Sequence, residues 1–409
     1  MSEITFIAGG ATAAQGFSAT GEHMGIRRNR TRRDVALIVS EIPANAACVY
    51  TQNLVKGAPI LVTQKHVENG IAQAVICNSG NANTCNANGV EIAEGMCALV
   101  EKYIGVKAED VIVASTGVIG QPMTLEPFEK NFGKLADSLE DTPAGGTRAA
   151  EAIMTTDTVS KEVAVRFPLG GKMCKLGGIS KGSGMIAPNM ATMLCFLTTD
   201  AAIAPQLLHE ALLAVVDDTF NMLSVDGDTS TNDMVVVLAN GAAGNTLVTE
   251  KNADYDAFLE ALHALCTAIC RHLAADGEGA TKLLECRVSG AASVKDARLA
   301  AKAVANSALL KAAMFGADAN WGRVLCAIGY SGAAVDVDKI DVSFRSAKGQ
   351  VDVCQNGAGI PFSEEEASLV LGEGEIEILI HLHMGQESAQ AYGCDLTYDY
   401  VKINGDYRT

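Results

Sequence analysis

Residues 181–197 constrain this chain most, because a loop-forming segment there runs directly into an apolar strand. The first half of the stretch contains two glycines, a proline and an asparagine, which favour turns and extended backbone over helix. The second half, residues 193–197, is a short apolar run typical of a buried strand. Thr192 lies at the junction, so a hydroxyl group is expected at the mouth of a core strand, where a nucleophile can be built. An ordinary glycine turn that enters a strand would give the same pattern, with Thr192 only a good strand former.

The composition predicts a large apolar core and an acidic surface. The chain has 409 residues, of which 48% are hydrophobic and 19% charged, a length that allows about two or three domains. The net charge of −17 argues against nucleic acid or an anionic membrane as the main partner, although a pocket can still hold an anionic small molecule.

The cysteine and histidine patterns favour a reduced, metal-free protein. The twelve cysteines include no C-x-x-C pair, which is unlike a disulfide framework or a zinc site. His381 and His383 are interpreted as structural, and the acidic loop 226–233 lacks the later residues that a calcium loop needs. Neither a secretory signal nor an apolar run of about 18–20 residues is found, so we expect a soluble, cytoplasmic protein.

Hydrophobic periodicity predicts an α/β fold. The expected helices are 90–104, 124–153 with a break near 142–146, 204–222, 255–275 and 293–310. The expected strands are 34–40, 47–51, 72–77, 110–120, 162–167, 193–197, 325–331, 338–345, 349–354, 375–383 and 394–403. The basic cluster between Arg27 and Arg33 is interpreted as a solvated loop.

Three loops carry candidate chemistry. Thr116 and Gly117 end a buried strand, where a backbone N–H beside a hydroxyl can form an oxyanion hole; a simple turn at Gly117 fits equally well. The polar cluster 154–158, which contains Thr155, is either a helix-end cap or a substrate contact. The asparagine-rich loop 78–86 either lines a pocket or is a turn tied by its own side chains, and the sequence favours the turn. Gly277-x-Gly279 follows a helix and opens a strand, the reverse of the order in a dinucleotide site.

Residues 181–197 resemble the cleavage-site signature of the ornithine acetyltransferase (glutamate N-acetyltransferase) family, whose members cut themselves between the Ala and Thr of an Asn-Met-Ala-Thr-Met motif. The similarity covers essentially the whole chain. The departures are mild: Gly405 stands where an alanine is common, and the basic cluster near Arg27 is denser than usual. Besides the cleavage motif, the matching segments are 78–83, 114–120, 155–158, 277–281, 316–323 and 404–409.

The resemblance implies an α/β fold of layered sheets and helices. This fold is of the ornithine acetyltransferase and autoproteolytic aminopeptidase type and is N-terminal-nucleophile-like. It also implies self-cleavage between Ala191 and Thr192 into an alpha chain, 1–191, and a beta chain, 192–409, which stay intertwined. Two copies of each chain would form a heterotetramer. No cofactor or metal is implied.

The resemblance further assigns roles to single residues. Thr192 would be the nucleophile and Thr116 with Gly117 the oxyanion hole. Substrate-binding residues would be Thr155, Lys181, Thr192, Glu278, Asn404 and Thr409. The implied reaction of arginine biosynthesis moves the acetyl group of N2-acetyl-L-ornithine to L-glutamate through acetyl-Thr192, releasing ornithine and then N-acetylglutamate. Acetyl-CoA is a candidate second donor, which the sequence does not decide.

Two alternatives remain open at this stage. A related autoproteolytic aminopeptidase would release amino acids from peptides and show no preference for glutamate as acceptor. An acidic α/β binding protein would keep the backbone between Ala191 and Thr192 intact.

Overall fold

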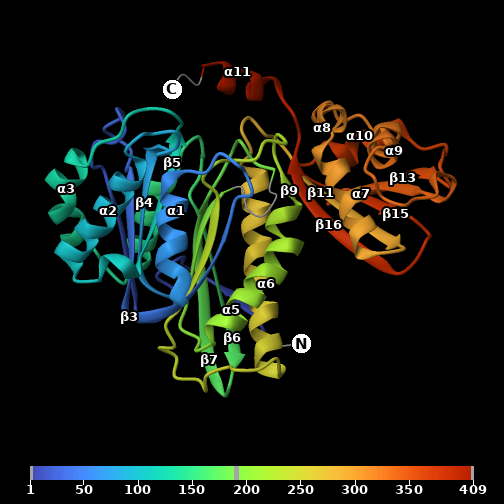
Figure 1. Cartoon of the computed structure of the whole chain (residues 1–409). Coiled ribbons are helices and arrows are strands. Elements are labelled where there is room, and N and C mark those ends of the chain that lie inside the picture. The colour runs from blue at the N-terminus through green and yellow to red at the C-terminus, as the bar shows by residue number, and fades with distance from the viewer. Residues whose placement is uncertain (1–2, 188–192, 407–409) are drawn as a thin grey trace. The chain divides into compact units, whose positions relative to one another are not determined.

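The computed structural model of the chain describes residues 3–187 and 193–406. The chain forms two compact units, coloured by residue number in Figure 1. Unit 1 comprises Met1–Gly182, Asn189–Asp217 and Thr229–Ile269, and unit 2 comprises Ser183–Pro188, Asp218–Asp228 and Cys270–Thr409. Each unit is a β-sheet packed against helices, so the predicted α/β fold of layered sheets and helices is confirmed.

Unit 1 is built on a sheet of nine strands. Their order is β1-β6-β7-β8-β10-β3-β4-β5, with β2 also paired to β3. Their bounds are β1 Thr5–Ile7, β2 Phe17–Glu22, β3 Val35–Tyr50, β4 Ile71–Asn81, β5 Val111–Val118, β6 Lys161–Leu169, β7 Lys172–Lys181, β8 Leu194–Thr199 and β10 Met234–Ala239.

Strand β8 confirms the apolar strand expected after Thr192. All six of its residues are buried, because β8 lies inside the sheet between β7 and β10. Leu194 is opposite Lys181 in the antiparallel β7 and opposite Met234 in the parallel β10. This register places the end of β7 and the start of β10 on either side of the residue at which β8 begins.

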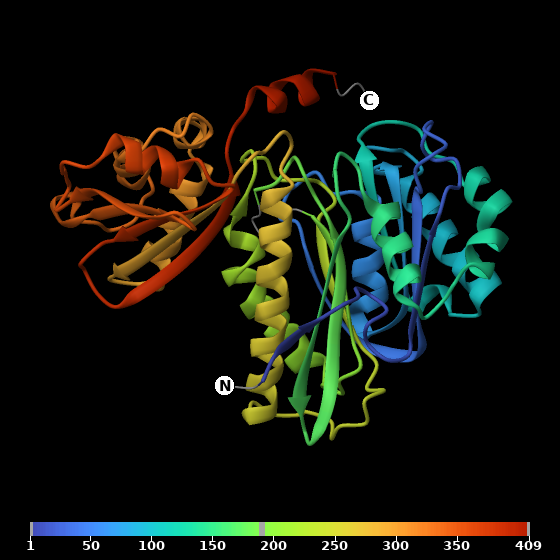
Figure 2. The same ribbon diagram turned by 180° about the vertical axis from the view of Figure 1, so that it is seen from behind.

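Helices cover the sheet of unit 1. Helices α1 Ala58–His66, α2 Gly89–Ile104 and α3 Glu126–Asp137 pack against the face of β3, β4 and β5 that carries Leu37 and Ile76, as Figure 2 shows from behind. Helix α4 Pro143–Ile153 packs against the face that carries Ile38. Helix α5 spans Pro205–Asp218. Helix α6, Ala253–Ala275, lies along β6 and contacts it through Phe258 and Phe167, whose ring centroids are 6.2 Å apart.

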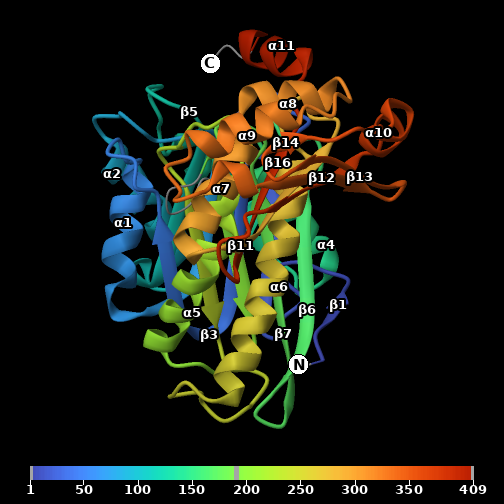
Figure 3. The ribbon, with the colours of Figure 1, turned by 90° about the vertical axis from the view of Figure 1, so that its right-hand side faces the viewer.

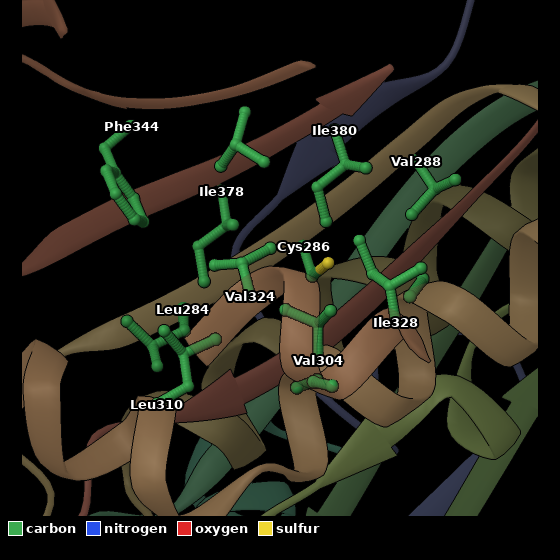
Figure 4. Close-up of a cluster of buried hydrophobic side chains, with 14 of the residues drawn as sticks. Leu284, Cys286, Val288, Val304, Leu310, Val324, Ile328, Phe344, Ile378 and Ile380 are labelled. Carbon is green, nitrogen blue, oxygen red and sulfur yellow. The ribbon is translucent and has the colours of Figure 1, made fainter. Parts of the chain in front are cut away.

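Unit 2 has a second sheet, in the order β14-β13-β12-β15-β11-β16-β9. Aliphatic side chains from the strands and from helices α7 to α10 form one buried cluster, part of which Figure 4 shows. The strands are β9 Leu223–Ser224, β11 Leu283–Ala291, β12 Asp341–Ser346, β13 Gly349–Gln355, β14 Ala358–Gly359, β15 Glu375–His381 and β16 Glu387–Cys394. The helices are α7 Val294–Asn306, α8 Ala308–Phe315, α9 Trp321–Gly329, α10 Glu364–Leu371 and α11 Tyr398–Asp406, also labelled in Figure 3.

Several expected elements were wrong. Residues 325–331, predicted as a strand, belong mainly to α9, in which Val324, Ala327 and Ile328 are buried at helical spacing. Residues 394–403, also predicted as a strand, contain the end of β16 and then α11. The predicted helix 293–310 is two helices, because Ser307 caps the second one through Leu310 N–H.

Unit 1 differs from the predicted elements in further places. The strands predicted at 34–40 and 47–51 are one strand, β3, whose pairing with β4 shifts register between Val39 and Ala44. Strands β1, β2, β7 and β10 and helix α1 were not predicted at all. Among the described residues, no helix combines the length and the apolar character needed to cross a lipid bilayer.

Candidate active site

The predicted oxyanion residues lie where β5 ends beside β4. Thr116 is opposite Ser79 and Gly117 is opposite Gly80, and the pairing becomes irregular at Asn81. Gly117 has a φ of 125°, which side chains rarely permit. A Cβ atom at Gly117 would lie 2.5 Å from the carbonyl carbon of Gly80. Both its conformation and this close approach therefore require glycine at position 117.

The asparagine-rich loop is a turn tied by its own side chains, as the sequence favoured. Asn78 Nδ2 donates to the carbonyl of Asn81 at 2.9 Å, and Asn83 Nδ2 donates to that of Gly89 at 2.8 Å. Ser115 Oγ donates to Asn78 Oδ1 at 2.6 Å. These amides fix the backbone beside Thr116 and are already engaged by the protein itself.

Asn232, which the sequence did not single out, supports the same region from the acidic loop before β10. Its Nδ2 donates to the carbonyl oxygens of Ala82 at 2.6 Å and Ser115 at 3.0 Å. Asn232 is buried, and Thr84 Oγ1 donates to its Oδ1 at 2.6 Å. The loop rejected as a calcium site thus stabilises the ends of β4 and β5.

A buried carboxylate joins two of the predicted substrate-binding segments. Asp157 Oδ2 accepts the backbone N–H of Thr155 at 2.9 Å, and its Oδ1 accepts that of Gly182 at 2.7 Å. Lys161 Nζ lies 2.7 Å from the same Oδ1. Lys181 is the last residue of β7 and is buried. Asp157 therefore links the loop of Thr155 to the residue that follows Lys181.

The charge balance around Asp157 favours the ionised carboxyl. Burial alone would raise its pKa, but the ammonium groups of Lys181 and Lys161, with hydrogen bonds from Lys161 and Gly182, hold that pKa below the ordinary range. Two buried ammonium groups thus stabilise the charge of one buried carboxylate.

The basic cluster is more than a solvated loop. Arg32 Nη1 donates to the carbonyl oxygen of Thr155 at 2.9 Å, and Arg27 Nη2 donates to that of Met154. Both guanidinium groups therefore tie the segment 154–158 to the start of the chain. No local pattern predicts this contact, because the arginines and the residues that they bind are more than a hundred positions apart.

A second buried carboxyl, that of Asp233, lies at the start of β10. Its exposed fraction is 4%, and its Oδ2 has no hydrogen-bond partner among the described residues. The next residue, Met234, donates its N–H to the carbonyl of Met193 at 2.9 Å. Burial raises the pKa of Asp233 well above the ordinary carboxyl value, against the opposing effects of Ser230 and Lys181. A buried carboxyl group whose pKa is raised therefore lies at the start of β10, beside the strand that Thr192 precedes.

In unit 2, the loop 183–187 is bound by residues far away in sequence. Glu278 donates its N–H to the carbonyl of Ser183 at 2.9 Å, and a Cβ at Gly184 would lie 2.4 Å from the Glu278 carboxyl carbon. Glu278 Oε2 accepts Asn404 Nδ2 at 2.7 Å. Two predicted substrate-binding residues, Glu278 and Asn404, are thus in direct contact.

Three predicted site residues are not among those that the structure describes. Ala191, Thr192 and Thr409 lie outside the described residues. Thr116, Gly117, Thr155 and Lys181 belong to unit 1, whereas Glu278 and Asn404 belong to unit 2. Within the described ranges, no cluster of three or more His, Cys, Asp or Glu residues is arranged to hold a metal ion.

Comparison with known proteins gives the family. The profile of the ArgJ family matches residues 18–409. The arginine biosynthesis bifunctional protein ArgJ of Symbiobacterium thermophilum is 50% identical over 99% of this chain and 100% of its own length. That of Caldanaerobacter subterraneus is 50% identical over 97% of both chains.

Among solved structures, the argJ protein of Bacillus halodurans is 46% identical, with a TM-score of 0.49 over 52% of this chain and 98% of that chain. The profile match and the full-length relatives confirm the resemblance seen in the cleavage motif over nearly the whole chain, and the chain belongs to the ArgJ family.

Proposed function

We propose that the chain is a glutamate N-acetyltransferase of arginine biosynthesis, which moves the acetyl group of N2-acetyl-L-ornithine to L-glutamate. The observation that carries this proposal is the family match over residues 18–409, together with a relative that is 50% identical over its whole length. The conformation of Gly117 beside Gly80 supports it, because an oxyanion hole needs a rigid backbone N–H at a fixed place.

The first step is self-cleavage. Thr192 Oγ attacks the carbonyl carbon of Ala191, the peptide C–N bond breaks, and the acyl group passes from nitrogen to oxygen. Water then hydrolyses the ester, which releases the Ala191 carboxylate and leaves Thr192 with a free α-amino group. The products are an alpha chain, 1–191, and a beta chain, 192–409.

The strand order supports chains that stay together after cleavage. Strand β8 of the beta chain is hydrogen-bonded between β7 of the alpha chain and β10, which in turn pairs with β3 of the alpha chain. Separating the chains would break these ladders and expose the buried residues of β8. We further expect two copies of each chain in a cytoplasmic heterotetramer.

The new α-amino group then serves as the general base. A free α-amine has a pKa of about 7.7–8, so a modest downward shift leaves much of it neutral at pH 7. Lys181 lies opposite Leu194, two residues after Thr192. Its ammonium group would lower the pKa of the amine by like-charge repulsion.

Acetyl transfer proceeds in two halves. Thr192 Oγ attacks the acetyl carbonyl of acetylornithine, and ornithine leaves with the proton that the α-amine accepted. The amino group of glutamate then attacks the acetyl-threonine ester and releases N-acetylglutamate. The Thr116 hydroxyl and the Gly117 N–H would stabilise each oxyanion, where a single donor contributes about 2.7–4 kcal/mol.

Charged residues would orient the amino acids. Glu278 is buried and suits a cationic amine, whereas Lys181 suits a carboxylate. Thr155, Asn404 and Thr409 complete the proposed substrate-binding set. No step needs a cofactor. Acetyl-CoA is proposed as a second acetyl donor, a role consistent with the word bifunctional in the names of the relatives.

Denaturing electrophoresis and a transfer assay test the proposal together. We expect two fragments in place of one 42.6 kDa band, and N-acetylglutamate from acetylornithine and glutamate. The variant Thr192→Ala should stay intact and inactive. Full transfer activity in that variant would refute the nucleophile, and release of amino acids from peptides without transfer to glutamate would favour an aminopeptidase. Incubation with acetyl-CoA and glutamate, without acetylornithine, tests the second donor: N-acetylglutamate forms only if acetyl-CoA is used.

A further inference from the structure

Asp226 binds the segment that leads to the proposed cleavage site. Its Oδ2 accepts the N–H of Met185 at 2.6 Å, and its Oδ1 accepts the N–H of Ile186 at 2.9 Å. In return, the N–H of Val225 donates to the carbonyl of Ile186 at 2.7 Å. All of these residues belong to unit 2. The loop is therefore fixed to residues 225–226 by bonds in both directions.

The bond to Met185 holds an unfavourable backbone conformation. Met185 has a φ of 56°, in the left-handed region that residues with a side chain rarely adopt. Its side chain is 45% exposed, so packing does little to compensate. Such strain persists only where the surroundings determine it, and here the Asp226 carboxylate supplies that constraint.

The same carboxylate also binds the C-terminal helix. Tyr400 Oη donates to Asp226 Oδ2 at 3.2 Å, the oxygen atom that accepts from Met185. Burial and the Asp226 charge raise the pKa of Tyr400, so its hydroxyl keeps the proton that it donates. None of the residues of α11 is buried. Its position therefore depends on a few contacts, of which Tyr400 with Asp226 and Asn404 with Glu278 are two.

We infer that Asp226 is a positioning residue for self-cleavage, and that through Tyr400 it also positions the helix that carries Asn404. The inference rests on the proposed function, because it concerns the cleavage and the substrate residues proposed above. Attack by a hydroxyl on a peptide carbonyl requires close alignment, and small displacements of the reacting groups are costly. A carboxylate that fixes residues 185 and 186, five residues before the scissile bond, would limit such displacements.

The variant Asp226→Asn tests the first role. Both oxygens of Asp226 accept backbone N–H groups, and an amide can accept at only one of its two ends. We expect self-cleavage of the freshly made full-length chain to slow by about 10- to 100-fold. The matched control is Asp228→Asn, which removes the same charge from an exposed residue two positions away and should cleave at the wild-type rate.

Two substitutions at Met185 keep the test decisive if Asp226→Asn does not fold. Met185→Pro removes the N–H and imposes a negative φ, while leaving the carboxylate untouched. It should slow cleavage as much as Asp226→Asn. Met185→Gly accepts the left-handed conformation without strain, so it should cleave normally alone and partly restore the rate of Asp226→Asn.

The second role is tested by Tyr400→Phe, which should cleave at the wild-type rate but raise KM for acetylornithine with little change in kcat. Wild-type cleavage in both Asp226→Asn and Met185→Pro would overturn the inference. An unchanged KM in Tyr400→Phe would show that Asp226 does not position α11 through Tyr400. Failure of the wild-type chain itself to cleave would instead refute the proposed function.

Discussion

Asp157 Oδ1 and Lys161 Nζ are 2.7 Å apart, and both side chains are closed to solvent. Taking two charges out of water is costly, and their mutual attraction repays this cost only when further hydrogen bonds complete the site. Here the backbone N–H groups of Thr155 and Gly182 supply those bonds. The pair therefore fixes two loops that the proposed chemistry needs.

Removing the carboxylate charge should destabilise the protein. Asp157→Asn breaks the buried ion pair with Lys161 by removing one of its two charges, which typically costs about 3–5 kcal/mol. Urea unfolding at pH 7 measures the loss. Replacing both partners, as in Asp157→Asn with Lys161→Met, should recover part of the free energy of unfolding, because only the Lys181 ammonium then remains buried in place of two.

A matched control is Asp200→Asn. Asp200 is also buried and accepts two backbone N–H groups, from Lys175 at 2.7 Å and Gln15 at 3.1 Å. Burial, however, raises the pKa of Asp200, whereas the pKa of Asp157 is lowered. The Asp200 variant should therefore lose less stability. An equal or larger loss would contradict the role given to the ion pair.

Asp233 should make the stability of the protein fall as the pH rises. Its pKa in the folded protein is raised by burial, whereas an unfolded aspartate ionises near about 3.9. Folding therefore takes up a proton above that pH, and the contribution of Asp233 to stability is lost as the pH rises toward its folded pKa. The variant Asp233→Asn should match the wild type near pH 4 and exceed it in Tm at pH 7 to 8. A difference in Tm that does not change with pH would show that Asp233 titrates normally.

Periodicity predicted many of the helices and strands, because apolar spacing is a local signal. Helix α2 and strand β8 follow from apolar spacing alone. Strand β7 was missed because its residues include glycines and exposed lysine and methionine side chains, which look like a loop. The alternating pattern of 398–403 resembles a strand, yet α11 forms there with no buried face.

The site residues were predicted from family motifs. The residues that hold them in place were not predicted, because they lie outside those motifs or had no assigned role there. Asp157 and Lys161 join Gly182 only through the pairing of β6 with β7. Asp226 reaches Met185 across 41 positions. A carboxylate in a polar loop gives no indication of which distant N–H it will accept. Contacts of this kind require the structure.

Gly117 should tolerate no side chain. Gly117→Ala would place a Cβ 2.5 Å from the Gly80 carbonyl carbon and strain a φ of 125°, which displaces the N–H proposed for the oxyanion hole. Loss of one such donor lowers kcat by about 10²- to 10³-fold. Initial rates at saturating acetylornithine and glutamate measure the effect.

Gly120→Ala is the control for backbone conformation in the same loop. Gly120 also has a positive φ, 77°, but nothing lies within 4 Å of a Cβ built there. Gly120→Ala should therefore be destabilised by the positive φ alone and keep most of its activity. If both variants lost activity equally, the close approach to Gly80 would not be the cause.

Glu278 should contribute charge rather than shape to substrate binding. Its carboxylate is buried and accepts Asn404 Nδ2 at 2.7 Å, and Glu278→Gln keeps the size of the side chain while removing the charge. A hydrogen bond to a charged group contributes about 1.5–3 kcal/mol, so kcat/KM for acetylornithine should fall by about 10- to 100-fold, mainly through KM. Glu364→Gln, an exposed glutamate at the start of α10, should leave kcat/KM unchanged. A normal KM in Glu278→Gln would mean that the substrate amine binds elsewhere, and that the contact with Asn404 serves only to hold α11.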